Sequence, residues 1–91
     1  MEQVRKSYIY KFQEACDRAK KFIKRPPDNE LLELYSYYKQ AVVGDVNIPK
    51  PNDPKGKAKW EAWNSRKGIL QPLAKEKYVQ IVHNLAPKYE K

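Results

Sequence analysis

Apolar positions in the first part of the chain recur at helical spacing. Between residues 7 and 24 they follow one another at steps of three and four, as a helix with one buried face requires. They are Tyr8, Phe12, Ala15, Cys16, Ala19, Phe22 and Ile23. Pro26 and Pro27 follow; proline lacks the amide hydrogen that a helix needs and disfavours helical dihedral angles in the preceding residue. The pattern predicts a first helix over about residues 7–24 that the two prolines stop.

A second helix is predicted from Asp28 to Val43. Asp28 is expected to cap its N-terminus, and Glu30 adds a negative charge near the positive end of the helix dipole. Gly44 is suited to the left-handed conformation that commonly ends a helix. The next segment, residues 45–52, carries two prolines and no helical period, which indicates an ordered loop.

Two further helices complete the pattern. Asp53 followed by Pro54 is typical of a cap and first turn, and this third helix is expected to continue to Gly68. Pro72 marks the first turn of a fourth helix, which Pro87 is expected to end. Its apolar stripe consists of Ala74, Tyr78, Ile81, Val82 and Leu85. Since no segment shows the alternation of a strand, the sequence predicts an all-α fold, a four-helix bundle in a single domain over residues 1–91.

Composition narrows the classes of function. Nineteen Lys and Arg against eleven Asp and Glu give a formal net charge of +8, which attracts anions, with phosphates as the first candidates. The single cysteine excludes an internal disulfide and a thiolate metal cluster. The first residues of the sequence include no apolar stretch long enough for a signal peptide, and no segment has the roughly 18 consecutive apolar residues of a membrane span. We therefore expect a cytoplasmic protein with an anionic partner.

The segment YSYYKQ, residues 35–40, holds three of the seven tyrosines next to a lysine. Residues three and four apart are neighbours on a helix, so Tyr35, Tyr38 and Lys39 are expected together while Tyr37 points to the opposite side. The phenols and the ammonium group are therefore predicted at the edge of an apolar surface. The apolar residues on the same arc are Leu31, Leu32, Leu34 and Val42.

The third predicted helix repeats this combination of cations and aromatic rings. Lys55 and Lys59 are four apart, and Trp60 and Trp63 are three apart on a neighbouring face. We expect both tryptophans in the core, because large aromatic residues at helical spacing commonly fill a small bundle. Gly56 has two interpretations: it destabilises the helix by about 1 kcal/mol, or it lets another group approach the backbone. The cations expected on a solvated face are Lys57, Arg66 and Lys67.

The sequence does not favour catalysis. Cys16 falls on the apolar stripe of the first helix, where a buried small residue is expected, and His83 is the only histidine. A thiol and an imidazole would still need a third, orienting group. There is no glycine-rich phosphate loop, nucleophile elbow or metal-ligand spacing. We therefore expect no enzyme and no metal site.

Two segments together resemble the acyl-CoA-binding proteins, a family of small cytosolic carriers of long-chain acyl-CoA esters. LYSYYKQAVVGDVN resembles the family's motif around its second helix, and KGKAKWEAWNSRKG resembles its third helix. Phe12, Lys20, Pro26 and Tyr78 match the family in order and spacing. The resemblance covers about residues 8–86. It implies a four-helix bundle with a shallow bowl between the second and third helices that holds the head group of the ligand.

The resemblance also implies which residues bind acyl-CoA. The positions matching the family's CoA contacts are Lys20, Tyr35, Ser36, Tyr37, Tyr38, Lys39, Lys55, Lys59 and Tyr78. In the family, positions matching Tyr35, Lys39 and Lys59 hold the 3′-phosphate, and the position matching Tyr38 lies against the adenine. The position matching Tyr78 approaches the acyl end, and those matching Leu31 and Leu32 line the path of the tail.

The expected function is therefore binding and transport of medium- to long-chain fatty acyl-CoA. The protein is expected to be a monomer that needs no cofactor, binds no nucleic acid and contacts membranes at most transiently. Two alternatives remain at the level of sequence. The charge and the interleaved aromatic residues also permit a helical nucleic-acid-binding domain, although no helix carries an arginine-rich surface. The second alternative is a module that docks on a membrane surface or a protein partner. With any of these functions, the chain could also be one domain of a larger protein.

Overall fold

The computed structural model of the protein describes residues 2–90, with side chains from Lys11 onward. This part of the chain contains four helices and no strand, which confirms the predicted all-α fold. The helices are α1 (Glu2–Lys20), α2 (Asp28–Val42), α3 (Pro54–Asn64) and α4 (Gln71–Tyr89).

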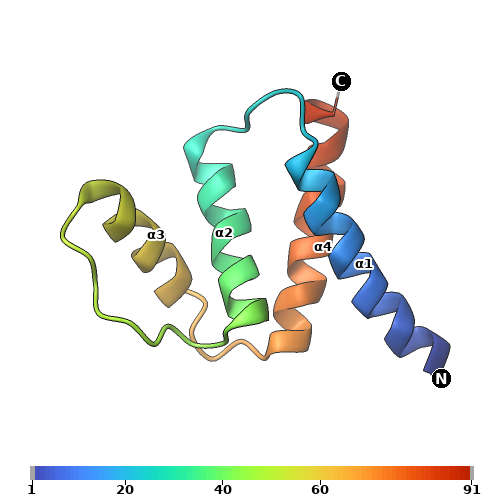
Figure 1. Ribbon diagram of the computed structural model, residues 1–91, viewed down its shortest axis with the longest axis horizontal. Helices are drawn as coiled ribbons and strands as arrows, with labels where there is room; N and C mark the ends of the chain where they lie inside the picture. The colour runs from blue at the N-terminus through green and yellow to red at the C-terminus, as the bar shows by residue number, and fades with distance from the viewer. Residues whose placement is uncertain (1, 91) are drawn as a thin grey trace.

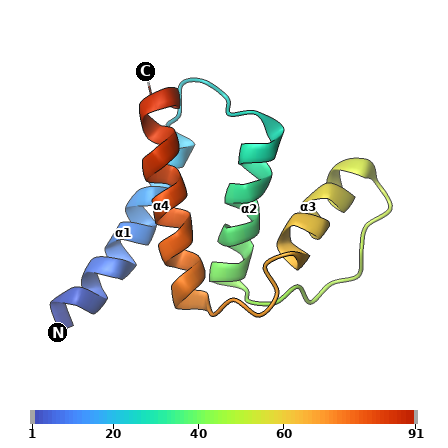
Figure 2. The same cartoon turned by 180° about the vertical axis from the view of Figure 1, so that it is seen from behind.

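α2 lies in the middle of a flat arrangement. It packs against α4 on one side and α3 on the other, while α1 packs across α4 on a diagonal (Figures 1 and 2). Among the described residues, α3 packs against no helix except α2. The molecule measures 43 × 32 × 15 Å. Because α3 has a single helical neighbour, the groups that fix it to α2 determine the shape of the space between them.

The main core joins α1, α2 and α4. Its buried residues are Phe12, Ala15, Leu34, Ala41, Ala74, Tyr78, Val82 and Leu85. These positions confirm the apolar stripes predicted for the first and fourth helices, with one exception. Ile23 was expected in the first stripe, but 73% of its surface is exposed. Tyr8, the first member of that stripe, lies outside the described side chains.

α1 ends at Lys20, four residues earlier than predicted. The chain tightens there, since the amides of Lys21 and Phe22 bond to carbonyls only three residues back. The next amides, of Ile23 and Lys24, donate to the carbonyl of Tyr89 in α4, at 2.8 and 3.1 Å. Hydrogen bonds to α4 therefore replace the helical ones before the two prolines are reached. The early start of α1, at Glu2, was also not predicted.

The predicted cap of the second helix is wrong by one residue. Pro27 occupies the N-cap position in extended conformation, and its carbonyl accepts from the amides of Glu30 and Leu31. Asp28 is the first helical residue and makes no cap bond; its carboxylate pairs instead with Arg25 at 3.1 Å. At the other end, Gly44 has φ +99°, the left-handed conformation predicted there.

α3 begins as predicted and ends earlier. Asp53 is the N-cap, and its carboxylate accepts from the amide of Gly56 at 2.7 Å. A Cβ atom at Gly56 would lie 2.7 Å from that carboxylate, so the cap itself is the group that approaches this glycine closely. The helix ends at Asn64 and turns continue to Gly68, which has φ +92°.

Pro87 does not end the fourth helix, contrary to prediction. α4 continues to Tyr89, with Pro87 inside its last turn. The ring removes only the amide that would bond to His83, and the amide of Glu90 still donates to the carbonyl of Ala86 at 2.9 Å. The carbonyl of Tyr89 also accepts the amides of Ile23 and Lys24. The end of α4 is therefore held by contacts to a distant segment, which no local sequence pattern indicates.

A set of polar contacts, which we call the α2 corner, joins the C-terminal end of α2 to the residues around α3. The Asp45 carboxylate accepts from the Gln40 side chain at 2.9 Å and from the amide of Gly68 at 2.8 Å. The indole N–H of Trp63 donates to the carbonyl of Gly44 at 2.8 Å. Gln71 donates to carbonyls in the last turn of α2, which would otherwise lack partners.

The α2 corner makes stability depend on pH through Asp45. The Gly68 amide, followed by the Gln40 side chain, holds the pKa of the Asp45 carboxyl below its ordinary value. Because the folded-state pKa is the lower one, ionised Asp45 stabilises the fold above the unfolded-state pKa of about 3.9. This contribution is lost as the pH falls through the folded-state value.

We therefore expect the wild-type melting temperature to fall more steeply below about pH 5 than that of Asp45→Asn, whose amide can accept the same bonds without titrating. Thermal unfolding followed by circular dichroism over a pH series measures this. The acid titration of Glu30 and other carboxylates is common to both proteins, so the difference isolates Asp45. Parallel curves for the two proteins would show that Asp45 contributes no pH dependence.

Candidate functional site

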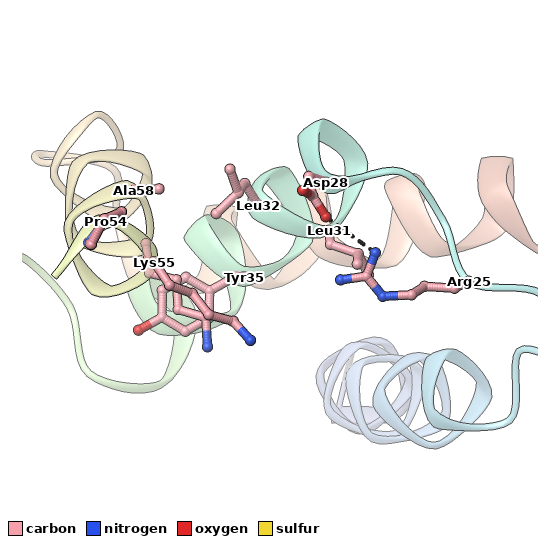
Figure 3. A pocket seen from close by; sticks show the side chains of 9 residues that line it. Arg25, Asp28, Leu31, Leu32, Tyr35, Pro54, Lys55 and Ala58 are labelled. Atoms are coloured by element: carbon pink, nitrogen blue, oxygen red, sulfur yellow. Dashed lines mark hydrogen bonds and ion pairs between the residues drawn. The ribbon is translucent and has the colours of Figure 1, made fainter.

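The larger of two neighbouring hollows lies between α2 and α3 and has a volume of about 680 Å³. We call it the α2–α3 groove. Its lining residues are Arg25, Asp28, Leu31, Leu32, Tyr35, Pro54, Lys55, Ala58 and Lys59. Figure 3 shows α3 with Pro54, Lys55 and Ala58 on one side and the Arg25–Asp28 ion pair on the other. The groove thus combines an apolar surface with a cationic rim.

The second hollow, which we call the tyrosine groove, has a volume of about 300 Å³. Its lining residues are Cys16, Ala19, Lys20, Phe22, Pro26, Leu31, Leu34, Tyr35, Tyr38 and Tyr78. Leu31 and Tyr35 line both hollows. The two grooves are therefore neighbours, with one turn of α2 as their common wall.

Three aromatic rings from three helices form one side of the tyrosine groove. The ring centroid of Tyr78 lies 5.3 Å from that of Phe12 and 6.0 Å from that of Tyr38. Burial, and then the neighbouring Cys16 thiol, raise the pKa of Tyr78 well above its ordinary value. Burial also raises the pKa of Cys16. At neutral pH the groove therefore offers a protonated phenol and an unionised thiol.

Two lysines of the α2–α3 region lie over aromatic rings. The Lys59 ammonium is 5.3 Å from the centroid of Tyr35, and the Lys39 ammonium is 4.9 Å from the centroid of Trp63. Such cation–π contacts are worth about 0.5–2 kcal/mol, depending on exposure. The protein's own rings thus hold the Lys59 ammonium at Tyr35 and the Lys39 ammonium at Trp63.

Most of the site residues predicted from the sequence lie together. The predicted residues that line one or both grooves are Lys20, Leu31, Leu32, Tyr35, Tyr38, Lys55, Lys59 and Tyr78. Ser36, Tyr37 and Lys39 line neither. Tyr37 lies away from the grooves, as helical geometry predicts. Lys39 follows Tyr35 by one turn and occupies its position over Trp63.

Ser36 and Tyr37 contact Arg66, a contact that sequence reasoning missed. Ser36 is fully buried, donates to the carbonyl of Glu33 at 2.7 Å and accepts from the Arg66 guanidinium at 3.0 Å. The guanidinium carbon also lies 4.2 Å from the centroid of Tyr37. Arg66, predicted on a solvated face, is thus half-buried and in contact with α2, whereas Lys57 and Lys67 are exposed as expected.

The tryptophans divide between two roles. Trp63 is in the core as predicted, with 2% of its surface exposed. Trp60 is only half-buried; its indole N–H donates to the carbonyl of Ile48 at 2.8 Å, and the Lys50 ammonium lies 5.6 Å from its ring. Trp60 therefore fastens the loop before α3 rather than filling the core.

Several lining residues were not predicted as site residues. Ala58 lies one turn from Lys55 on α3, so helical spacing alone could have identified it. Arg25 and Pro26 enter the grooves from the connection between α1 and α2, whose path no periodic pattern indicates, and Asp28 enters from the first residue of α2. Phe22 and Leu34 belong to apolar stripes and could have been taken only for core residues.

The described residues, 2–90, contain no group of three or more metal-ligating side chains placed to hold an ion. Cys16 and His83 line different hollows. No helix in the same range is both long and apolar enough to cross a bilayer.

Comparison with known proteins shows the family of this chain. The family model described as "Acyl CoA binding protein" matches residues 10–82. The chain belongs to the acyl-CoA-binding protein family. This is a family of binding proteins whose ligand is acyl-CoA.

A curated member of the family is similar over most of its length. This "Acyl-CoA-binding protein homolog" of Drosophila melanogaster is 48% identical over 80 residues, which cover 86% of this chain and 93% of the relative. The two segments that carry the resemblance, residues 34–47 and 55–68, both lie within the part of the chain that the family model matches. The resemblance to this family is therefore confirmed.

Solved structures of the family share the arrangement of helices. The crystal structure of Oryza sativa acyl-CoA-binding protein 2 matches with a TM-score of 0.84 at 30% identity and covers 89% of this chain and 92% of that one. The protein from Moniliophthora perniciosa matches with a TM-score of 0.81 at 39% identity, covering 90% and 83%. The predicted four-helix fold of the acyl-CoA-binding type is therefore confirmed.

The contacts of Arg66 predict that its substitution lowers the stability of the fold but leaves the affinity for acyl-CoA unchanged. Arg66→Lys removes the planar group that both stacks on Tyr37 and donates to Ser36, and we expect it to lower the free energy of unfolding by about 1–2 kcal/mol. Because Arg66 lines neither groove, acyl-CoA affinity should stay within about twofold of wild type. Urea unfolding and calorimetric titration measure the two quantities. Lys57→Arg, at an exposed site, is the control; equal stability of both variants would contradict a structural role for Arg66.

Proposed function

We propose that the chain binds medium- to long-chain fatty acyl-CoA esters and carries them between sites of use without acting on the thioester. The observation that supports this most is the α2–α3 groove, in which the apolar side chains of Leu31, Leu32 and Ala58 lie beside the cations Lys55 and Lys59. A fatty acyl-CoA also joins an apolar tail to a phosphorylated head. Membership of the family supports the same ligand class.

The tail is proposed to occupy the α2–α3 groove over Leu31, Leu32 and Ala58. Each methylene removed from water contributes about 0.8 kcal/mol, so a long tail could supply on the order of 10 kcal/mol before ordering costs are subtracted. A short tail would make few contacts in this groove. Affinity is therefore expected to rise with tail length until the groove is filled.

The 3′-phosphate is proposed to lie at Tyr35, between the ammonium groups of Lys39 and Lys59. The Lys59 ammonium lies over the Tyr35 ring, and Lys39, four residues further along α2, has its ammonium over Trp63. A phosphate with close to two negative charges makes charge-assisted hydrogen bonds to such donors, worth about 1.5–3 kcal/mol each. Lys55, on the rim of the groove, is proposed to contact the phosphorylated head as well.

The adenine is proposed to lie against Tyr38, of which 39% is exposed at the tyrosine groove. Lys20 and Tyr78 line the same groove and are proposed to contact the remainder of the ligand between head and tail. For Ser36 and Tyr37 we propose an indirect role. Ser36 is fully buried and Tyr37 lies against Arg66, so both are suited to holding this turn of α2 rather than to touching the ligand.

We further propose a non-catalytic, monomeric, cytoplasmic protein that acts as one domain and uses no cofactor. The raised pKa values of Cys16 and Tyr78 keep both groups protonated, which supports binding without attack on the thioester. The lysines beside the grooves stand over rings and apolar side chains rather than along one basic surface, which argues against a nucleic-acid partner.

Tail length tests the proposal most directly. We expect isothermal titration calorimetry to give an affinity at least about a hundredfold higher for palmitoyl-CoA than for free CoA, because only the former buries methylenes in the groove. Octanoyl-CoA should fall between them. Equal affinities for all three ligands would refute binding of the tail, while no binding of any of them would refute the proposed function.

Lys59 tests the position of the 3′-phosphate. Lys59→Ala should weaken palmitoyl-CoA binding about tenfold or more while its helical circular dichroism stays unchanged. The matched control is Lys57→Ala, an exposed lysine of the same helix outside both grooves. With 3′-dephospho-palmitoyl-CoA the two variants should bind alike. If Lys59→Ala loses the same factor with the dephosphorylated ligand, Lys59 does not contact the 3′-phosphate.

A further inference from the structure

A short basic segment, residues 20–25, runs from the last residue of α1 into the connection to α2, and we call it the basic loop. Its sequence is KKFIKR, with four cations and no acidic residue. Ile23 lies between these cations in the sequence, and 73% of its surface is exposed. Among the large hydrophobic residues of the described chain, Leu70 is exposed to the same extent and the others are exposed less. An aliphatic side chain in water, surrounded by positive charge, contributes nothing to the core.

The backbone of the basic loop is fixed although Ile23 is exposed. The amides of Ile23 and Lys24 donate to the carbonyl of Tyr89 at 2.8 and 3.1 Å. The ring of Phe22 turns inward and lies 6.0 Å from that of Tyr89. The Tyr89 hydroxyl in turn donates to Glu30, which also pairs with Lys88 at 3.1 Å. These contacts hold the loop to α4 and leave the side chain of Ile23 outside.

The charges on the basic loop differ in their partners. Arg25 pairs with Asp28 at 3.1 Å, so its charge is largely balanced. Lys21 and Lys24 are exposed, and neither takes part in an ion pair within the described part of the chain. The nearest acidic residue before them in sequence is Asp17, in the last turn of α1. Two exposed lysines, Lys21 and Lys24, therefore flank Ile23 in the basic loop.

We propose that the basic loop docks the protein on an anionic phospholipid bilayer, with Lys21 and Lys24 against the lipid headgroups and Ile23 inserted at the interface. Segments that combine an aliphatic side chain with lysines bind such surfaces by burying apolar area and by attraction to anionic lipids. Lysines also contact the phosphates of nucleic acids, but bases stack on aromatic side chains, and the exposed side chain of the loop is aliphatic. The combination of charge and exposed isoleucine thus favours a bilayer.

Docking in this orientation would place the grooves at the membrane. Lys20, Phe22 and Pro26 line the tyrosine groove, and Arg25 lines the α2–α3 groove, so the loop forms part of the edge of both. In Figure 1 the loop lies at the end of the molecule where α2 begins and α4 ends. The consequence would be transfer of the ligand between groove and bilayer, and this part rests on the proposed acyl-CoA binding. The docking itself is independent of acyl-CoA binding.

Sedimentation of the full chain, without acyl-CoA, with vesicles tests the docking. We expect the protein to sediment with vesicles of phosphatidylcholine and phosphatidylserine, to do so less at high salt, and to stay in solution with phosphatidylcholine alone. Lys21→Glu combined with Lys24→Glu should weaken vesicle binding by more than about tenfold. Lys57→Glu combined with Lys77→Glu changes the net charge equally at exposed sites elsewhere and should weaken it by less than about threefold.

The isoleucine has its own matched control. Ile23→Asn should weaken vesicle binding roughly fivefold, because it removes the inserted apolar group. Leu70 is also 73% exposed but lies at the other end of α4, and Leu70→Asn should leave vesicle binding unchanged. All variants should keep wild-type circular dichroism and wild-type affinity for palmitoyl-CoA, which separates docking from the ligand site.

Three results would overturn the proposal. The first is the absence of any preference for phosphatidylserine, which would also direct the search for a partner of the basic loop to acidic proteins. The second is an equal effect of both charge reversals, which would assign vesicle binding to net charge alone. The third is an equal effect of Ile23→Asn and Leu70→Asn. Failure of palmitoyl-CoA binding with vesicle binding intact would refute the proposed function and leave the docking in place.

Discussion

The position of α3 depends on hydrogen bonds made in the α2 corner, and the α2–α3 groove depends on the position of α3. α3 packs against no other helix of the described chain, so its placement rests on this single interface. Trp63 and Gln40, with 2% and 1% of their surfaces exposed, make their bonds there away from water. An unsatisfied buried polar group costs about 1–3 kcal/mol, which penalises other placements of the helix. The corner thereby sets the distance between Lys59 and Tyr35.

The central place of α2 explains why one helix serves two grooves. One edge of α2 faces α3 and the other faces the α1–α4 pair, so Leu31 and Tyr35, at the boundary, line both hollows. A ligand that joins two chemically different parts can then place them on either side of a single turn. The connection from α1 closes the same end of both grooves, because the carbonyl of Tyr89 holds it against α4. Four helices of modest length thus provide adjoining sites without a deep cavity.

Local signals predicted much of the fold and of the grooves. Apolar periodicity identified the core, Asp53 and Gly44 marked true helix ends, and spacing of three and four brought Tyr35 and Tyr38 to the grooves. The errors arose where distant contacts decide the outcome. After the early end of α1, the chain makes hydrogen bonds to Tyr89 in α4. Arg66 contacts Ser36 and Tyr37, about 30 residues before it in the sequence. Sequence spacing within one helix carries no information on such pairs.

The tyrosines beside lysines in α2 suit a site that must hold cations in place before an anion arrives. A free lysine side chain loses about 2 kcal/mol of conformational freedom when it is fixed, and a binding site that fixes it beforehand avoids that cost on binding. The rings of Tyr35 and Trp63 keep the ammonium groups of Lys59 and Lys39 near one turn of α2. Leucine would fill the same volume without attracting a cation. The need for phenol and indole rings here is therefore electrostatic as well as hydrophobic, because each ring packs on one side and orients a charge on the other.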